Sequence, residues 1–97
     1  MKLFISQPMK GKTDEQILEE RNKAAGLFIL EGENVEVIDS FFKDAPAQAA
    51  PLWYLGESIK LLCQADVVYF CKDWQKYNGC TIEHECAVRY GKTIVYA

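Results

Sequence analysis

Short apolar runs alternate along this chain with longer stretches of helical spacing. The apolar runs at residues 3–5, 35–38, 66–70 and 93–96 predict short strands. Between them, apolar side chains recur at every third or fourth position, which predicts helices. This alternation predicts one α/β domain over residues 1–97: a three-layer flavodoxin-like or Rossmann-like fold with a parallel sheet of about four strands and helices on both faces.

Local signals set the ends of the first two predicted helices. Residues 13–16 have the form of a capping box, and Gly32 is a suitable stop after a helix that reaches Glu31. Pro51 suits the first position of the second helix, which we expect to end near Gln64. Residues 40–50 have no clear period and predict a flexible loop or lid. The helical spacing of the first helix comes from Ile17, Arg21, Ala24 and Phe28, backed by Ala25 and Leu27.

A carboxylate interrupts the apolar face of the third predicted helix. At 3.6 residues per turn Glu83 shares a face with Cys80, Ala87 and Tyr90. Burying an unpaired carboxylate costs several kcal/mol, so such a residue has either a partner or a chemical role. Glu83 is therefore the first candidate for chemistry, the alternatives being an ion pair with Lys or Arg or an escape to solvent.

Other candidate residues follow the predicted strands. Ligands of parallel α/β sheets bind outside the carboxyl ends of the strands, and we expect Ser6, Asp39, Asn78 and Glu83 to converge there. The segment that begins at Ser6 is either a substrate-contacting loop or a turn, and Asp39 either binds a ribose hydroxyl or caps its loop.

The loop before the third helix is polar and aromatic. Trp74 and Tyr77 either stack on a base or cover the sheet edge or a subunit contact. With Trp53 and Tyr54 they form an aromatic surplus that a small domain cannot bury, and this predicts a homodimer or larger homo-oligomer.

Metal and redox chemistry have little support in the sequence. The four cysteines are expected to be reduced thiols. Cys80 and His84 have a spacing that suits two ligands of one metal, but the chain has no second histidine and no carboxylate-rich cluster, so no metal is expected. His84 and Glu85 are predicted on the solvent side of the helix, with His84 turned away from Glu83.

Composition and motifs exclude several classes of binding partner and cofactor. The net charge is −3, the pI is about 5.1 and no basic run exists, which argues against a nucleic acid polymer as partner. Neither a dinucleotide fingerprint nor a P-loop is present, so no cofactor is expected. The sequence has no stretch apolar enough to span a membrane and does not begin like a signal peptide, which predicts a cytoplasmic protein.

Three segments resemble the nucleoside 2-deoxyribosyltransferase-like superfamily, which also contains deoxynucleoside-monophosphate N-glycosidases. They are residues 4–11, residues 59–66, and Gly79-x-x-x-Glu83-x-x-x-Ala87 followed by Gly91-Lys92. They occur in the superfamily's order over nearly the whole chain. The chain looks most like small bacterial and phage members of the superfamily.

The resemblance implies that the protein binds a nucleoside or nucleotide and cleaves or transfers its N-glycosidic bond. Glu83 falls at the position of the nucleophile, where the carboxylate attacks C1′ of the sugar as the base departs. The substrate contacts would come from Ser6, Gln7, Met9, Gly11, Asp39, Ser58, Trp74, Asn78 and Gly79. A neighbouring subunit completes the pocket in this superfamily.

Two positions depart from the superfamily's pattern. Ser58 stands where the transferases carry an aspartate that places the sugar or assists the leaving base, and Glu85 stands where a glycine is usual. The alternative is therefore a non-catalytic nucleotide-binding protein, a sensor or sequestering protein that has lost the reaction. A purely structural or partner-binding domain is a third possibility, without specific support in the sequence.

Overall fold

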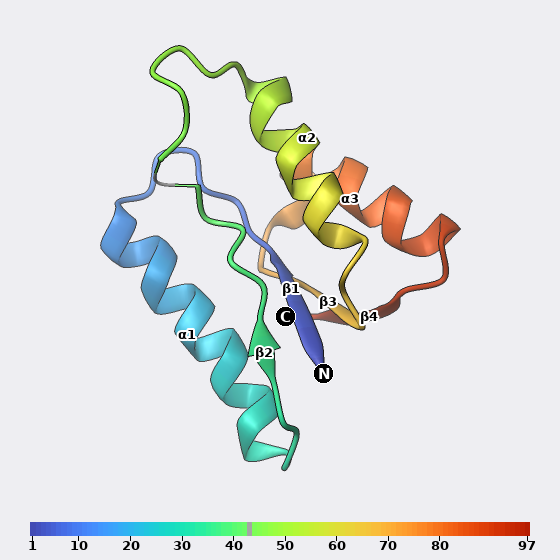
Figure 1. The fold of residues 1–97 in the computed structure, drawn as a ribbon. Coiled ribbons are helices and arrows are strands. Elements are labelled where there is room, and N and C mark those ends of the chain that lie inside the picture. Colours follow the sequence, from blue (N-terminus) through green and yellow to red (C-terminus); the bar gives the residue numbers. More distant parts are fainter. Residues whose placement is uncertain (43) are drawn as a thin grey trace.

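Four parallel strands in the order β2-β1-β3-β4 form the centre of the domain (Figure 1). The computed structural model describes residues 1–42 and 44–97. The strands are β1 (Lys2–Ser6), β2 (Glu36–Val37), β3 (Val67–Phe70) and β4 (Thr93–Tyr96). The helices are α1 (Asp14–Leu30), α2 (Pro51–Leu62) and α3 (Asn78–Arg89), with a short 3₁₀ helix η1 (Trp74–Lys76) before α3. The predicted fold class is confirmed.

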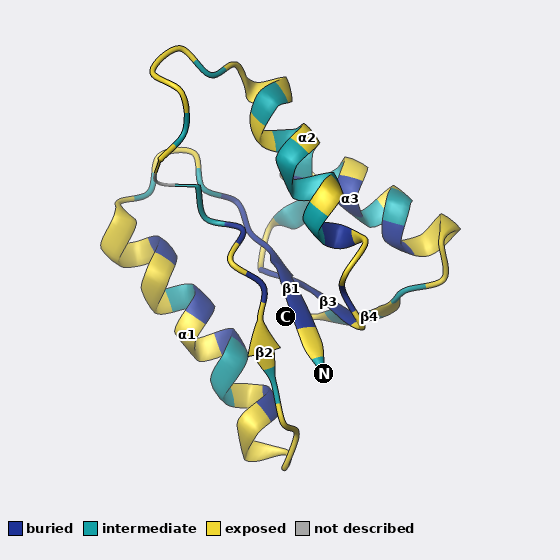
Figure 2. Ribbon diagram, viewed as in Figure 1, coloured by how far each residue is buried: buried dark blue, intermediate teal, exposed yellow. Residues whose placement is uncertain are grey.

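Side chains alternate between the two faces of the sheet and build two cores. On one face Leu3, Ile5 and Tyr69 pack with Ala24 and Phe28 of α1. On the other face, the core consists of strand and helix side chains that include Phe4, Val68, Phe70, Leu62 and Ala87. Helix α1 thus covers one face, and α2 and α3 cover the other (Figure 1). Every residue of β3 is buried, as expected for a strand covered on both faces (Figure 2).

The capping and stop signals read from the sequence are present in the structure at the ends of α1 and α2. The Gln16 amide donates to Thr13 Oγ1 at 3.2 Å, and the Thr13 amide donates to Gln16 Oε1 at 2.9 Å, which completes the capping box of α1. Gly32 follows the end of this helix with φ +81°, a conformation that favours glycine. Pro51 is the first residue of α2, and this helix ends at Leu62, slightly before the predicted Gln64.

Two further boundaries differ from the sequence prediction. The second strand is limited to Glu36–Val37, although the Ile38 amide still donates to Leu3 O at 2.9 Å. Tyr90 was expected on the buried face of the third helix, and this was wrong, because α3 ends at Arg89 and Tyr90 is 81% exposed. The chain leaves the helical path at this point, so the helical spacing no longer applies to it.

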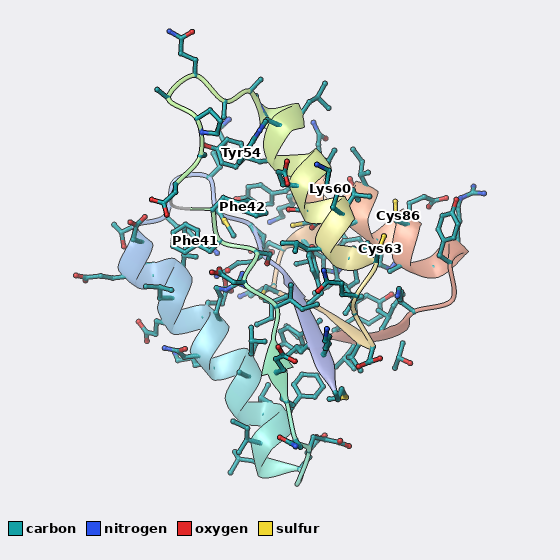
Figure 3. All side chains as sticks on the ribbon, viewed as in Figure 1. Phe41, Phe42, Tyr54, Lys60, Cys63 and Cys86 are labelled. Atoms are coloured by element: carbon teal, nitrogen blue, oxygen red, sulfur yellow. The ribbon has the colours of Figure 1, made fainter. Side chains whose placement is uncertain are left out.

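Aromatic side chains join the segment before α2 to that helix. Phe42 packs against Trp53 with ring centroids 5.8 Å apart, and Trp53 packs edge-on against Tyr54 at 5.1 Å. Figure 3 shows Phe42 and Tyr54 close to each other above the sheet. Lys43, within the predicted loop or lid of residues 40–50, lies outside the described residues. Across the described parts of the chain, no helix has the length and apolar character needed to cross a bilayer.

Candidate functional site

Glu83 is a buried carboxyl group at the point where β1, α2 and α3 meet. Its residue is only 7% exposed, and it lies with Cys80 and Ala87 on the inner face of α3. The Ser6 hydroxyl, at the end of β1, donates to Glu83 Oε1 at 2.7 Å. The Ser58 hydroxyl of α2 forms a further hydrogen bond with the carboxyl group. The predicted meeting of Ser6 and Glu83 is thus observed, and Ser58 joins them.

The surroundings of Glu83 raise the pKa of its carboxyl group to near neutral pH. Burial raises the pKa of Glu83 to about 7, while the hydrogen bonds from Ser6 and Ser58 and the charge of Arg21 act in the opposite direction. A carboxyl group with this pKa exchanges its proton in the pH range where many enzymes work. Near pH 7 both the charged and the neutral form of Glu83 are therefore populated.

A buried arginine lies behind this carboxyl group. Arg21 of α1 is 6% exposed, and its Nη2 donates to Ile38 O at 3.1 Å and to Ser40 Oγ at 3.0 Å. Burial lowers the pKa of Arg21, while the negative charges of Asp39 and Glu83 oppose this shift. The guanidinium group remains protonated at any physiological pH. Arg21 thus supplies a fixed positive charge to the site.

The sequence prediction counted Arg21 only among the residues that give the first helix its spacing, and gave it no role in the site. The signal that identifies Glu83 was present here too, because a charged side chain interrupts the apolar face of α1 between Ile17 and Ala24. A buried charge on each of two helices is a reason to expect the two charges near each other.

Gln7 fastens the loop after β1 to α1. Its Nε2 donates to Ile17 O and to Glu20 Oε1, both at 2.8 Å, and its Oε1 accepts from Arg21 Nη1 at 3.4 Å. Both amide donors are therefore used within the protein. The structure gives Gln7 a role in holding the loop, whereas the resemblance implied a substrate contact.

The rest of this loop forms a turn ahead of α1. The Lys12 amide donates to Met9 O at 3.1 Å, and Gly11 has φ +80°. Lys12 Nζ lies 3.3 Å from Glu20 Oε1, so the turn is also tied to the helix by an ion pair. Met9 is half-buried and Gly11 is exposed.

The remaining candidates lie around the site without contacting Glu83 in the described part of the structure. Asp39 is exposed, and its Oδ1 accepts from the Phe41 amide at 3.4 Å, which matches the loop-capping alternative. Asn78 is the exposed first residue of α3, and its backbone oxygen accepts from Thr81 Oγ1 at 2.9 Å. Gly79 follows it and is half-buried.

Trp74 belongs to a second cluster at the same edge of the sheet. Its ring stacks on His84 with centroids 4.2 Å apart and packs against Phe70 at 5.2 Å, and His84 Nε2 lies 2.6 Å from the Tyr96 hydroxyl. The expectation that His84 lies on the solvent side holds only in part, because His84 is half-buried and Trp74 of η1 stacks on its ring. Glu85 is exposed, as predicted, and pairs with Arg89.

All four cysteines are free thiols. Burial raises the pKa of Cys71 to about 12 and that of Cys80 to about 11, so both thiols are protonated and unreactive near neutral pH. Cys80 interacts with the Ser6 hydroxyl, whereas His84 bonds to Tyr96. The described residues contain no group of three or more side chains arranged to hold a metal ion.

No curated protein is similar enough to this chain to count as a match. One family model matches residues 1–96, almost the entire sequence. The chain therefore belongs to the family described as domain of unknown function DUF4406.

Proposed function

We propose that the protein binds a nucleoside or nucleotide at Glu83 and cleaves or transfers its N-glycosidic bond. The observation that carries this proposal is a buried carboxyl group at the carboxyl edge of a parallel sheet, held by the hydroxyl groups of Ser6 and Ser58. Ligands of such sheets bind at this edge. The resemblance to the nucleoside 2-deoxyribosyltransferase-like superfamily supports the choice of substrate.

The chemistry requires two displacements at C1′ of the sugar. Glu83 attacks C1′, the bond from C1′ to the base nitrogen breaks, and the base leaves with the bonding electron pair and takes up a proton. The resulting ester between Glu83 and the sugar is then opened by water, which gives hydrolysis, or by a second base, which gives transfer. This is the sequence of steps in retaining glycosidases, with a base as the leaving group.

The hydrogen bonds of Glu83 are suited to this role. Only the ionised carboxylate is a nucleophile, and the hydroxyl groups of Ser6 and Ser58 together with the charge of Arg21 favour that form against the effect of burial. The reaction rate should therefore rise as the pH passes through about 7, the pKa of Glu83, and level off above it, where Glu83 is ionised. A role as general acid would give the opposite slope.

The second candidate function is nucleotide binding without catalysis. Ser58 is the observation that favours it, because a hydroxyl group beside Glu83 cannot replace the carboxyl group that the transferases use at this position. A neutral Glu83 would then serve as a hydrogen-bond donor to the ligand. In either case we propose a cytoplasmic protein that acts as a homodimer or larger homo-oligomer.

The test is release of free base from a panel of nucleosides and their 5′-monophosphates. Glu83→Gln keeps the shape of the side chain and an acceptor oxygen for the Ser6 hydroxyl group, but it removes the nucleophilic carboxylate. Glu85→Gln, on the exposed side of the same helix, is the matched control. We expect the first variant to be inactive and the second to equal the wild type. Equal turnover by wild type and Glu83→Gln would refute the mechanism.

Ser58→Asp separates the two candidate functions. If the wild type binds nucleotides without releasing base, a gain of hydrolysis in Ser58→Asp shows that the serine had disabled an enzyme. Unchanged binding with continued inactivity supports the non-catalytic protein.

A further inference from the structure

A second concave region lies beside the Glu83 site, at the ends of β3 and β4. It has a volume of about 470 Å³, within the range of small-molecule sites. The pocket is lined by Phe70, Cys71, Lys72, Asp73, Trp74, Gln75, Tyr96 and Ala97. Glu83 and Ser6 are absent from this lining, so the pocket is distinct from the site around the Glu83 carboxyl group.

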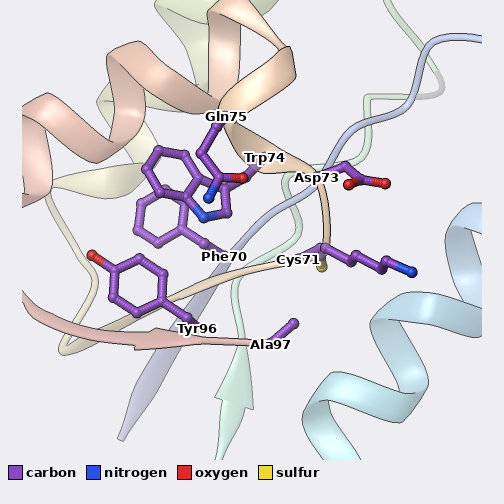
Figure 4. Close-up of a pocket in the computed structure, with 8 residues that line it drawn as sticks. Phe70, Cys71, Asp73, Trp74, Gln75, Tyr96 and Ala97 are labelled. Atoms are coloured by element: carbon purple, nitrogen blue, oxygen red, sulfur yellow. The ribbon is translucent and has the colours of Figure 1, made fainter.

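The walls of this pocket are aromatic side chains that contact one another and His84. Figure 4 shows Phe70, Trp74, Gln75 and Tyr96 gathered on one side of it, with Asp73 on the other. Trp74 and Tyr96 lie close to parallel, with an interplanar angle of 23° and ring centroids 5.8 Å apart. His84 holds both rings in place, because it stacks on Trp74 and forms a hydrogen bond with the Tyr96 hydroxyl group. These rings are therefore arranged before any ligand arrives, which lowers the entropic cost of binding.

Backbone groups close the floor of the pocket, and polar side chains line its rim. Backbone pairing of the Ala97 amide with Phe70 O at 2.9 Å closes the floor. Asp73 has φ 68°, the sole positive φ among the described residues other than glycine, and it turns the chain so that Lys72 and Gln75 both line the pocket. Asp73 pairs with Lys76 at 3.4 Å, whereas no hydrogen bond or ion pair is found for the exposed Gln75 side chain in the described structure.

We infer that this pocket is a binding site for a flat heteroaromatic ring with a hydrogen-bonding edge, the chemistry of a nucleobase. The ring lies against the exposed surface of Trp74 and Tyr96, and the Gln75 amide and the Lys72 ammonium group bond to its edge. The site takes a ring independently of the reaction at Glu83. A free base, a nucleoside and a nucleotide share this ring, and the experiment distinguishes them.

The two tryptophans of the chain make the test direct. Trp53 lies away from the pocket, packed between Phe42 and Tyr54. In Trp53→Phe, the fluorescence reports on Trp74 alone. We expect saturable quenching when adenine or uracil is added, and none with ribose 5-phosphate, which has no ring. Titrations with adenosine and AMP then show whether the sugar and the phosphate add affinity.

Nuclear magnetic resonance of the unaltered protein locates the ring. We expect the backbone shifts on adding adenine to concentrate at residues 72–75 and 97. Trp74→Leu should weaken binding on the order of tenfold, the usual contribution of one stacked ring. Glu85→Gln, on the exposed side of α3, should leave ring binding unchanged.

Three results would overturn the inference, and each is distinct from a failure of the proposed function. Shifts centred on Ser6 and Glu83 would place the ring in the other site. Equal effects of ribose 5-phosphate and adenine would remove the requirement for a ring. A dimer that dissociates in Trp74→Leu, with no response to any ring, would make the pocket an interface between copies. Absence of base release leaves ring binding at Trp74 unaffected.

Discussion

The Glu83 site and the Trp74 pocket lie at the same edge of the sheet but are built in opposite ways. Glu83 is buried, and its oxygens are satisfied by hydroxyl groups from β1 and α2. The Trp74 pocket is open and consists of stacked rings with polar side chains at its rim. The first arrangement shifts the ionisation of one buried group, and the second leaves aromatic surface open. One sheet edge thus carries a buried titratable group and an open cluster of aromatic rings.

The largest expected effect on stability is the loss of the buried cation behind Glu83. Arg21→Met removes a guanidinium group that bonds to Ile38 O, Ser40 and Gln7, and it leaves Glu83 without its positive neighbour. We expect the free energy of unfolding at pH 7 to fall by about 3–5 kcal/mol, typical of a broken buried charge network. Urea denaturation measures it, with the exposed Lys23→Met of the same helix as control. A loss below about 1 kcal/mol would show that Arg21 does not hold the site together.

Glu83→Gln is expected to stabilise the fold at alkaline pH. The folded-state pKa of about 7 lies above the ordinary value of 4.5, so the folded protein binds more protons than the unfolded chain between these values. The contribution of Glu83 to stability is therefore fully present below pH 4.5 and is lost as the pH rises through 7, by about 3 kcal/mol in total. The glutamine variant lacks this loss and should be more stable than wild type by about 3 kcal/mol at pH 8.

Denaturation of both proteins across the pH range checks this expectation. Near pH 4 the two free energies of unfolding should be similar. A variant that is less stable than wild type at pH 8 would show that the ionised Glu83 is stabilising and that its pKa is not raised.

A smaller effect is expected in the aromatic cluster. Tyr96→Phe removes the hydroxyl group that bonds to His84 at 2.6 Å but keeps the ring against Trp74. We expect a loss of about 1 kcal/mol in the free energy of unfolding. The pH at which Glu83 titrates, followed by carbon resonances of its carboxyl group, should not change. A shift of that titration would show that the two regions are coupled.

The sequence predicted the regions of this fold that depend on local signals. The capping box at Thr13, the proline that begins α2 and the apolar run of β3 can each be recognised from residues adjacent in the sequence. Glu83 was also predictable, because a carboxylate within an apolar helical face requires an explanation.

Other features depend on contacts between distant segments. His84 was placed on the solvent side because helical spacing cannot show that Trp74 of a neighbouring segment covers it. The pocket beside it combines residues from β3, η1 and β4, which no spacing along the chain brings together. Arg21 carried a readable signal, but its bonds to Ile38 O and Ser40 depend on how β2 runs beside β1.

The central claim is that Glu83 forms a bond with C1′ of a sugar. Incubation with a 2′-deoxy-2′-fluoro nucleoside, whose fluorine slows hydrolysis of the ester, followed by acid quenching and peptide mass spectrometry, tests it directly. We predict a mass increase of one glycosyl group on the peptide that contains Glu83, with release of one equivalent of base and no adduct in Glu83→Gln. An unmodified Glu83, or an adduct on another residue, would contradict the account.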